Sequence, residues 1–418
     1  MQDWLTFGKV VVIFIVVVVA MKKKVPMGIA LASGGVLIAM LMGKSAAWLG
    51  TSLAGGSDAV LFSAHTVQFV GVMGMIVALS TILDRAKQIE RLTGAFRSCF
   101  RNPRITLAAL PAIIGFLPMP GGALFSAPMV EASATGTSLD NEDKALINYW
   151  YRHVWEYAWP LYPGVLFSAQ LMQLETRVVA MWQAPLCVAA IVGGFVFLRR
   201  AVVPPASREE PRRGRAAGDA FVVLIPFMLV FVLHLVARID LTLSVGIGLV
   251  YACVWVAMAR HLSVGALAKA LFATWTVLDM MLMGYGAKIF GAMMEQSGAI
   301  VGIAHVFQSM HLPVVMLAVL LPMAVGFFAG MTIVYVMTTF PVLLAYPEVA
   351  AAPLPVFMLA FAAGYCGTLM SPVHSCYVVS THYFKSDLMK PLVRMALPCA
   401  LILATGAGLM LLYRRMHG

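Results

Sequence analysis

The chain has 418 residues, of which 61% are hydrophobic and only 11% are charged, and its mean hydropathy is +0.90. These values lie outside the range of soluble globular proteins and indicate an integral membrane protein. The net charge of +11 comes from basic residues in short loops between apolar segments, where they orient the membrane spans. The charge therefore predicts no nucleic-acid partner.

The first apolar stretch runs from about Leu5 to Met21. Lys9 is the one basic residue near its start, whereas Lys22, Lys23 and Lys24 follow it directly. Basic residues favour the cytoplasmic side of a membrane. This order predicts a retained span with the N-terminus outside the cell, and not a cleaved signal peptide.

Further apolar runs are long enough to cross about 30 Å of hydrocarbon, which takes roughly 20 residues. In the first half they lie near 5–21, 26–42, 65–83, 145–168 and 178–198. Adding 211 to these positions gives 216–232, 237–253, 276–294, 356–379 and 389–409, and each of these ranges is again apolar. We therefore expect five spans in each half. Since five is odd, the second half begins on the opposite side of the membrane.

An ungapped alignment of Leu83–Phe116 with Met294–Phe327 supports this internal repeat. It pairs seven identical residues in 34 positions, and four of them form the pattern L-P-x-x-x-G-F. The first copy carries six basic residues around this region, whereas 295–312 contains neither lysine nor arginine. By the positive-inside rule the two copies should have opposite orientations. Inverted repeats of this kind are typical of secondary transporters.

Each half also contains an apolar segment that is interrupted, at about 105–134 and 313–345. Their centres read G-F-L-P-M-P-G-G (115–122) and G-F-F-A-G-M-T (326–332). Proline removes a backbone donor and glycine weakens a helix, so neither segment should cross as one continuous helix. Backbone freed at membrane depth must be buried in protein or line a cavity. We expect two re-entrant hairpins that enter from opposite sides and meet near the midplane.

The expected fold is thus an all-α polytopic membrane protein built from two inverted-topology repeats, each with five transmembrane helices and one re-entrant hairpin. The repeats cover 1–198 and 220–418. Between them, 199–219 contains six arginines and two adjacent prolines. This composition predicts a solvated, cytoplasmic linker.

The densest polar cluster within an apolar stretch lies in 148–164. Asn148, Arg152 and Glu156 are spaced four residues apart and would share one helical face, with His153 beside them. Ionisable residues inside a bilayer are costly and mark functional sites by default. Arg152 and Glu156 could instead simply neutralise each other, and the aromatic residues around them could form an interfacial belt. Two prolines that break this helix favour a role in transport.

The equivalent stretch of the second half, 364–375, reads G-Y-C-G-T-L-M-S-P-V-H-S. Its glycines loosen the helix, and Ser371 and His374 supply polar groups near the break. His374 could bind substrate or carry a proton, because histidine titrates near neutral pH. The alternative is a histidine that is merely solvated at the cytoplasmic face.

Three further ionisable residues stand in or beside apolar segments. Lys288 is a candidate counter-charge for an anion, and Glu131 either caps a loop or binds a coupling cation. Asp279 lies nine residues before Lys288, on the opposite helical face, and is expected at the cytoplasmic interface. No phosphate-binding loop, catalytic carboxylate pair or Ser-His-Asp pattern stands out, so we expect no enzymatic activity.

The six cysteines show no C-x-x-C spacing and lie mostly in apolar segments. Neither a disulfide framework nor a zinc site is expected from this spacing. We expect buried and inert thiols and no metal ligands.

The stretches P-A-I-I-G-F-L-P-M-P-G-G-A-L-F-S-A-P-M-V-E (111–131) and G-Y-C-G-T-L-M-S-P-V-H-S-C (364–376) resemble a prokaryotic membrane-protein family of unknown function grouped with the ion transporter superfamily. The resemblance covers nearly the whole chain. It implies inverted five-span repeats with two hairpins, and often a homodimer. Better-known relatives carry carboxylates, other anions or sodium ions on Na+ or H+ gradients. The implied site lies on the two broken helices and the hairpin tips, at Pro120, Gly121, Gly122, Gly330 and Thr332.

The hairpin tips differ from those of the dicarboxylate carriers, whose tips carry a Ser-Asn-Thr signature. Here the tips read Pro-Gly-Gly and Gly-Met-Thr. Few side-chain oxygens remain for a hard cation such as Na+, which prefers oxygen ligands. Proton coupling through Glu156 or a histidine is therefore favoured over sodium coupling.

The leading hypothesis is a secondary active transporter in the prokaryotic inner membrane, which moves a small anionic metabolite of carboxylate or phosphate type by alternating access. It would need no cofactor beyond a coupling H+ or Na+. The alternative is a translocase for an anionic membrane lipid such as a polyprenyl phosphate. A third class is a membrane scaffold or receptor subunit that transports nothing.

Overall fold

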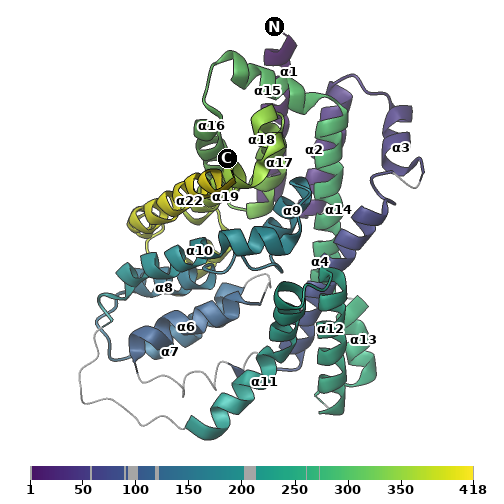
Figure 1. The fold of residues 1–418 in the computed structure, drawn as a ribbon. Coiled ribbons are helices and arrows are strands. Elements are labelled where there is room, and N and C mark those ends of the chain that lie inside the picture. The colour runs from purple at the N-terminus through teal and green to yellow at the C-terminus, as the bar shows by residue number, and fades with distance from the viewer. Residues whose placement is uncertain are drawn as a thin grey trace.

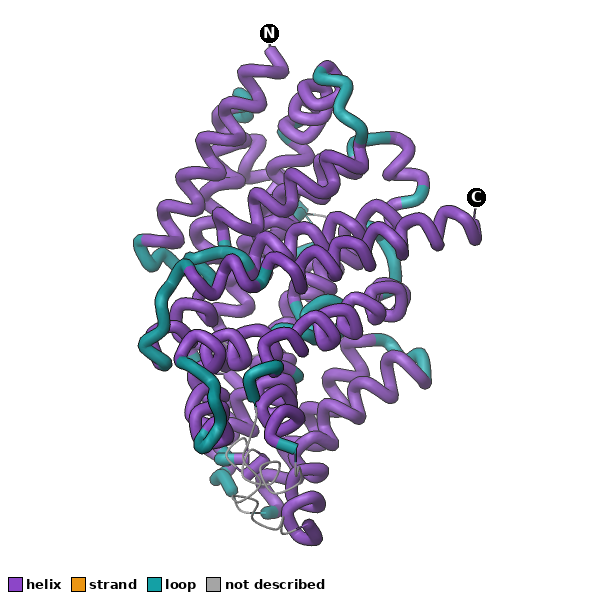
Figure 2. Tube along the Cα trace, turned by 90° about the vertical axis from the view of Figure 1, so that its left-hand side faces the viewer, coloured by secondary structure: helices purple, strands orange, loops and turns teal. Residues whose placement is uncertain are grey.

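A computed structural model describes residues 2–56, 59–88, 91–92, 102–117, 122–201, 213–259, 261–272 and 274–417. Throughout these ranges every regular element is a helix and no strand occurs (Figures 1 and 2). Within the described residues, six helical segments are apolar and long enough to cross a membrane. They cover Gln2–Lys22, Ala64–Arg85, Thr176–Leu198, Leu241–Met258, Val264–Gln296 and Lys390–His417. The fold agrees with the expected all-helical, multi-pass membrane protein.

The helices of the first half follow the expected order of apolar runs. They are α1 (Gln2–Lys22), α2 (Met27–Leu41), α3 (Ala46–Ala54), α4 (Ala64–Arg85), α6 (Pro103–Gly115), α7 (Gly122–Ala134), α8 (Asn141–Arg152), α9 (Pro163–Leu171) and α10 (Thr176–Gly194), with a 3-10 turn at Phe195–Leu198.

The second half begins with α11 (Arg213–Phe231), which ends in a π-helical turn at Val232–Val236. It continues with α12 (Leu241–Met258), α13 (Val264–Phe272), α14 (Trp275–Gln296), α15 (Ala299–Ser309), α16 (Val314–Ala329), α17 (Thr332–Leu344), α18 (Pro347–Ala351), α19 (Pro353–Leu369), α20 (Ser375–Tyr383), α21 (Lys390–Arg394) and α22 (Ala396–His417). The expected linker 199–219 thus overlaps the start of α11, and 202–212 lies outside the described residues.

Two of the expected spans are interrupted in the structure. The run at 145–168 divides into α8 and α9, and the run at 356–379 divides into α19 and α20. Pro163 is the first residue of α9, where a proline fits because its missing N–H would have no partner in the helix. The interrupted segments each form a pair of packed helices as well, α6 against α7 and α16 against α17.

The two halves pack on each other through helices that approach very closely. Helix α2 lies along α14, and α4 packs against both α12 and α14. At the α2–α14 contact, a Cβ atom on Gly286 would lie only 2.0 Å from the carbonyl oxygen of Gly28. Helices α16 and α19 make a similar contact, where a Cβ on Gly367 would lie 2.1 Å from the carbonyl oxygen of Met323. Small residues let membrane helices pack backbone against backbone in this way.

A buried polar network fixes α8 between α7 and α20. The Asn148 side-chain amide donates to the Ala123 carbonyl oxygen at 3.0 Å and to Ser380 Oγ at 2.9 Å. Its oxygen accepts a hydrogen bond from Ser126 Oγ at 2.6 Å. Because all these groups are satisfied inside an apolar core, the network specifies one arrangement of the three helices. It thereby positions the C-terminal end of α8.

Candidate functional site

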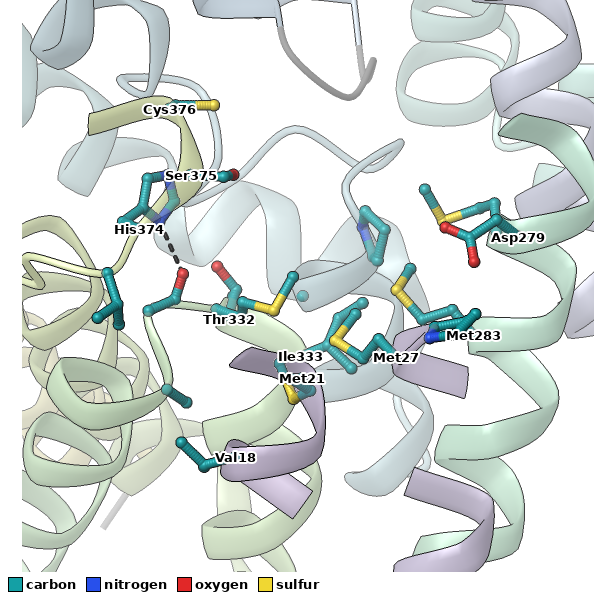
Figure 3. A pocket seen from close by; sticks show the side chains of 18 of the residues that line it. Val18, Met21, Met27, Asp279, Met283, Thr332, Ile333, His374, Ser375 and Cys376 are labelled. Carbon is teal, nitrogen blue, oxygen red and sulfur yellow. Dashed lines mark hydrogen bonds between the residues drawn. The ribbon is translucent and has the colours of Figure 1, made fainter. Parts of the chain in front are cut away.

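A cavity of about 570 Å³ lies where several interrupted segments meet. Its walls come from the α1–α2 connection, the break between α8 and α9, one side of α14, the α16–α17 break and the α19–α20 break (Figure 3). The polar and charged lining residues are Lys22, Lys24, Arg152, His153, Glu156, Tyr162, Asp279, Thr332, His374, Ser375 and Cys376. Most of the other lining residues are apolar, including several methionines.

Arg152 is the last residue of α8, and only 3% of its side chain is exposed. Its Nη1 lies 3.6 Å from Glu156 Oε1. A Cβ atom on Gly122 would lie 2.4 Å from both Nε and Nη2 of Arg152. Glycine at the first position of α7 therefore leaves room for this guanidinium, which a larger residue would displace.

The prediction that Asn148, Arg152 and Glu156 share one helical face is wrong for Glu156. Helix α8 ends at Arg152, and Glu156 lies beyond it in the turns at 153–158. Pro160 and Pro163 follow these turns and prevent one continuous helix across the segment. Glu156 instead turns back toward the helix end, where its carboxylate reaches Arg152 and lies 3.8 Å from His153 Nε2. Its side chain is 13% exposed.

The two histidines meet across the cavity wall. His153 caps the C-terminus of α8 and His374 is the N-cap residue of α20. Their Nε2 atoms lie 3.2 Å apart. Nδ1 of His374 lies 2.8 Å from the Gly330 carbonyl oxygen, and Nδ1 of His153 lies 2.5 Å from the Tyr149 carbonyl oxygen (Figure 3 shows the contact of His374). Residues far apart in the sequence thus share one site.

Besides α2, which begins at the lining residue Met27, three of the described helices begin at the cavity. Pro163, Thr332 and Ser375 are the first residues of α9, α17 and α20, and all three line it. None of these helices has a side-chain hydrogen bond at its N-cap residue. The first N–H groups of a helix lack partners within the helix, and its N-terminus carries partial positive charge. The three N-termini therefore direct positive potential toward the cavity.

Gly330 and Ser371 hold the α16–α17 break against the α19–α20 break, and Gly330 also lines the cavity. Gly330 ends α16 in the left-handed conformation, with φ of +66°, and a Cβ there would lie 3.0 Å from both Ser371 Oγ and His374 N. Ser371 is buried and donates a hydrogen bond to the Phe327 carbonyl oxygen at 2.6 Å. Ser371 does not line the cavity. It holds the α16–α17 turn against the α19–α20 break.

Two of the expected coupling residues lie away from the cavity. Glu131 is exposed and accepts a hydrogen bond from the Tyr383 hydroxyl at 2.8 Å. Lys288 places its Nζ 5.4 Å from the centre of the Phe69 ring. Neither residue lines the cavity, whereas Asp279, which was expected at the interface, does (Figure 3). Of the expected hairpin tip, Pro120 and Gly121 lie outside the described residues.

Some residues of the cavity were not predicted from the sequence to belong to a site. They are Cys376, Tyr162 and the lysines of the α1–α2 connection. Tyr162 donates a hydrogen bond to the Gly115 carbonyl oxygen at 2.5 Å and so joins the α8–α9 break to α6. Its position directly before Pro163 was the available signal. Cys376 follows His374 by two residues, whereas the sequence analysis considered only C-x-x-C spacing.

Fold and site together define a class, a helical multi-pass membrane protein with a charged cavity enclosed by broken helices. The chain belongs to the family described as protein of unknown function (DUF401), which it matches over residues 6–413. No curated protein matches it.

Proposed function

We propose that the protein is a secondary active transporter of a small anionic metabolite, of carboxylate or phosphate type. The observation that carries this proposal is the buried guanidinium of Arg152 in the wall of a cavity where the uncapped N-termini of α9, α17 and α20 converge. Each N-terminus contributes roughly half a positive charge. Anions bind at such helix ends because the N–H groups point at them.

The charges around the cavity agree with an anionic ligand. Arg152, Lys22 and Lys24 supply three positive charges, and Glu156 and Asp279 supply two negative ones. The difference, three minus two, leaves a surplus of one positive charge before the helix ends are counted. The volume of about 570 Å³ lies within the range of small-molecule sites, roughly 300–1,000 Å³.

We further propose the inverted-repeat architecture of the ion transporter superfamily. An offset of about 211 residues converts α2 into α12, α4 into α14, α7 into α17 and α9 into α20. Helix α2 packs on α14 and α4 packs on α12, and likewise α7 packs on α20 and α9 on α17. Exchanging the two halves thus converts each of these contacts into another one, as a two-fold relation requires. Such repeats support alternating access by moving one unit against the other.

In this proposal the interrupted segments α6–α7 and α16–α17 are the re-entrant hairpins. The protein acts in the prokaryotic inner membrane as a homodimer, with its N-terminus outside. Glu156 is the coupling residue, because its carboxylate lies between Arg152 and His153 at the cavity. A proton on Glu156 would change the charge that Arg152 presents to the substrate. Proton movement and anion binding are thereby linked.

Uptake into proteoliposomes tests the proposal. The purified protein is reconstituted and supplied with radiolabelled dicarboxylates or phosphate, with and without a pH gradient. Arg152→Gln removes a charged hydrogen-bond partner worth about 1.5–3 kcal/mol, which corresponds to an uptake about 10- to 150-fold lower at subsaturating substrate. Arg152→Lys retains the charge and should keep part of the activity. Glu156→Gln should remove the response to the pH gradient.

Arg177→Gln is the matched control. Arg177 lies outside the cavity and pairs with Glu175 at the protein surface, so its uptake should equal that of the unaltered protein. Size-exclusion chromatography in detergent establishes that each variant is folded. Unchanged transport in both Arg152→Gln and Glu156→Gln would remove these residues from the mechanism, and absence of anion uptake by the unaltered protein would refute the transporter.

A further inference from the structure

The hydrogen bonds of His153 and His374 determine which ring nitrogen carries the proton. In each histidine Nδ1 faces a backbone carbonyl oxygen, at 2.5 Å for His153 and 2.8 Å for His374. A carbonyl oxygen only accepts hydrogen bonds, so each Nδ1 is the protonated donor. In the neutral rings, Nε2 then carries a lone pair. The two Nε2 atoms face each other at 3.2 Å.

Two lone pairs at this distance repel unless a cation lies between them. Zinc binds histidine nitrogen at about 2.0–2.1 Å in tetrahedral geometry, which places two such nitrogens about 3.3–3.4 Å apart. The observed 3.2 Å is close to this separation. Backbone carbonyls that fix the other ring nitrogen are the usual outer-shell partners of metal-binding histidines.

A third potential ligand completes the group. Cys376 is buried, and its sulfur and one ring nitrogen of each histidine all lie within 4.8 Å of one another. All three residues line the cavity, and Figure 3 shows His374 and Cys376 at its wall. A proton shared between the histidines would need no third group, whereas thiolate and imidazole together are the ligands of soft and borderline transition metals. Hard cations prefer oxygen.

We propose that His153, His374 and Cys376 bind a transition-metal cation of the Zn2+ class. Three protein ligands leave a fourth position open toward the cavity, as in zinc sites that exchange a ligand. Glu156 Oε1, 3.8 Å from His153 Nε2, supplies the second negative charge beside the Cys376 thiolate. The two negative charges of Cys376 and Glu156 thereby balance the charge of the dication. This site does not depend on the transport proposal.

Cobalt binding to the purified, full-length protein in detergent provides the test. Co2+ reports tetrahedral geometry by its visible absorption and a cysteine ligand by a thiolate charge-transfer band in the near ultraviolet. We expect one Co2+ per chain, displaced by Zn2+. Cys376→Ser should abolish the charge-transfer band. His153→Ala and His374→Ala should each weaken binding at least about tenfold, the lower end of the loss seen even for outer-shell changes.

Cys253→Ser is the matched control, because Cys253 is a partly exposed cysteine on α12 outside the cavity. It should leave stoichiometry, affinity and both bands unchanged. Zn2+ should also raise the melting temperature of the unaltered protein and of Cys253→Ser, which shows that binding involves the folded chain. Absence of stoichiometric binding, or binding that survives all three ligand substitutions, would overturn the site and leave a shared proton between the histidines. Because no substrate is present, this result is independent of anion uptake.

Discussion

Replacing Gly286 by alanine tests the close contact between α2 and α14. The added Cβ would lie 2.0 Å from the carbonyl oxygen of Gly28 and 2.6 Å from its Cα. All of these atoms are backbone, so no side chain can rotate away. A contact of about 3.2 Å requires the helices to separate by more than 1 Å, and gaps of this size forfeit a quarter to a half of each dispersion contact.

The expected cost follows from two opposing effects. Overpacking a well-packed interior costs about 1–3 kcal/mol, and a rigid backbone contact belongs at the upper end. Alanine in place of glycine within a helix gains up to about 1 kcal/mol. We therefore expect Gly286→Ala to lower the free energy of unfolding by about 2 kcal/mol. The measurement is reversible denaturant unfolding in mixed micelles, followed by tryptophan fluorescence.

Gly246→Ala separates the two effects. Gly246 lies inside α12, and a Cβ there would meet nothing within 4 Å. This variant should gain helix stability without a clash and be at least as stable as the unaltered protein. If Gly286→Ala proved as stable as Gly246→Ala, the backbone contact between α2 and α14 would not exist in the folded protein.

Two further substitutions test the support of the cavity. Gly330→Ala places a side chain at φ of +66° and 3.0 Å from the backbone nitrogen of His374. It should therefore lower the free energy of unfolding by about 1–2 kcal/mol. Gly408→Ala is the control, because its Cβ would meet nothing within 4 Å, and it should not lower this free energy. Asn148→Leu removes three buried hydrogen bonds, each of which contributes about 0.5–1.5 kcal/mol to stability. Thermal unfolding should occur at a markedly lower temperature, and an unchanged midpoint would contradict the network.

The apolar runs predicted the helices because membrane-spanning segments must be about as long as the bilayer is thick. Interruptions were predictable as well, since Pro163 and Gly330 stand where α9 begins and α16 ends. What the sequence left open was the local course of the chain at each break. Glu156 was expected one helical turn beyond Arg152, but the helix had already ended, and the Arg152–Glu156 pair forms across a turn instead.

The candidate site was partly predictable for a related reason. Arg152, His153 and His374 stand beside helix breaks, and these breaks converge on the cavity. Glu131 and Lys288 looked equally suggestive as ionisable residues in or beside apolar runs. Each of them has a partner that tertiary packing brings close. Glu131 accepts a hydrogen bond from a residue 252 positions away, and Lys288 lies over an aromatic ring. No pattern in the sequence predicts which distant residues become partners.

Cys376 shows why the spacing of cysteines in the sequence did not predict the proposed metal site. Short spacings such as C-x-x-C place two ligands on one local turn. Here the cluster joins two separate breaks, and His153 and His374 are 221 residues apart, ten more than the offset of 211 that relates the proposed repeats. A two-fold arrangement brings equivalent breaks together at its axis. If the proposed repeats hold, ligands of one site are therefore expected at equivalent breaks of the two halves, far apart in the sequence and beyond the reach of any short motif.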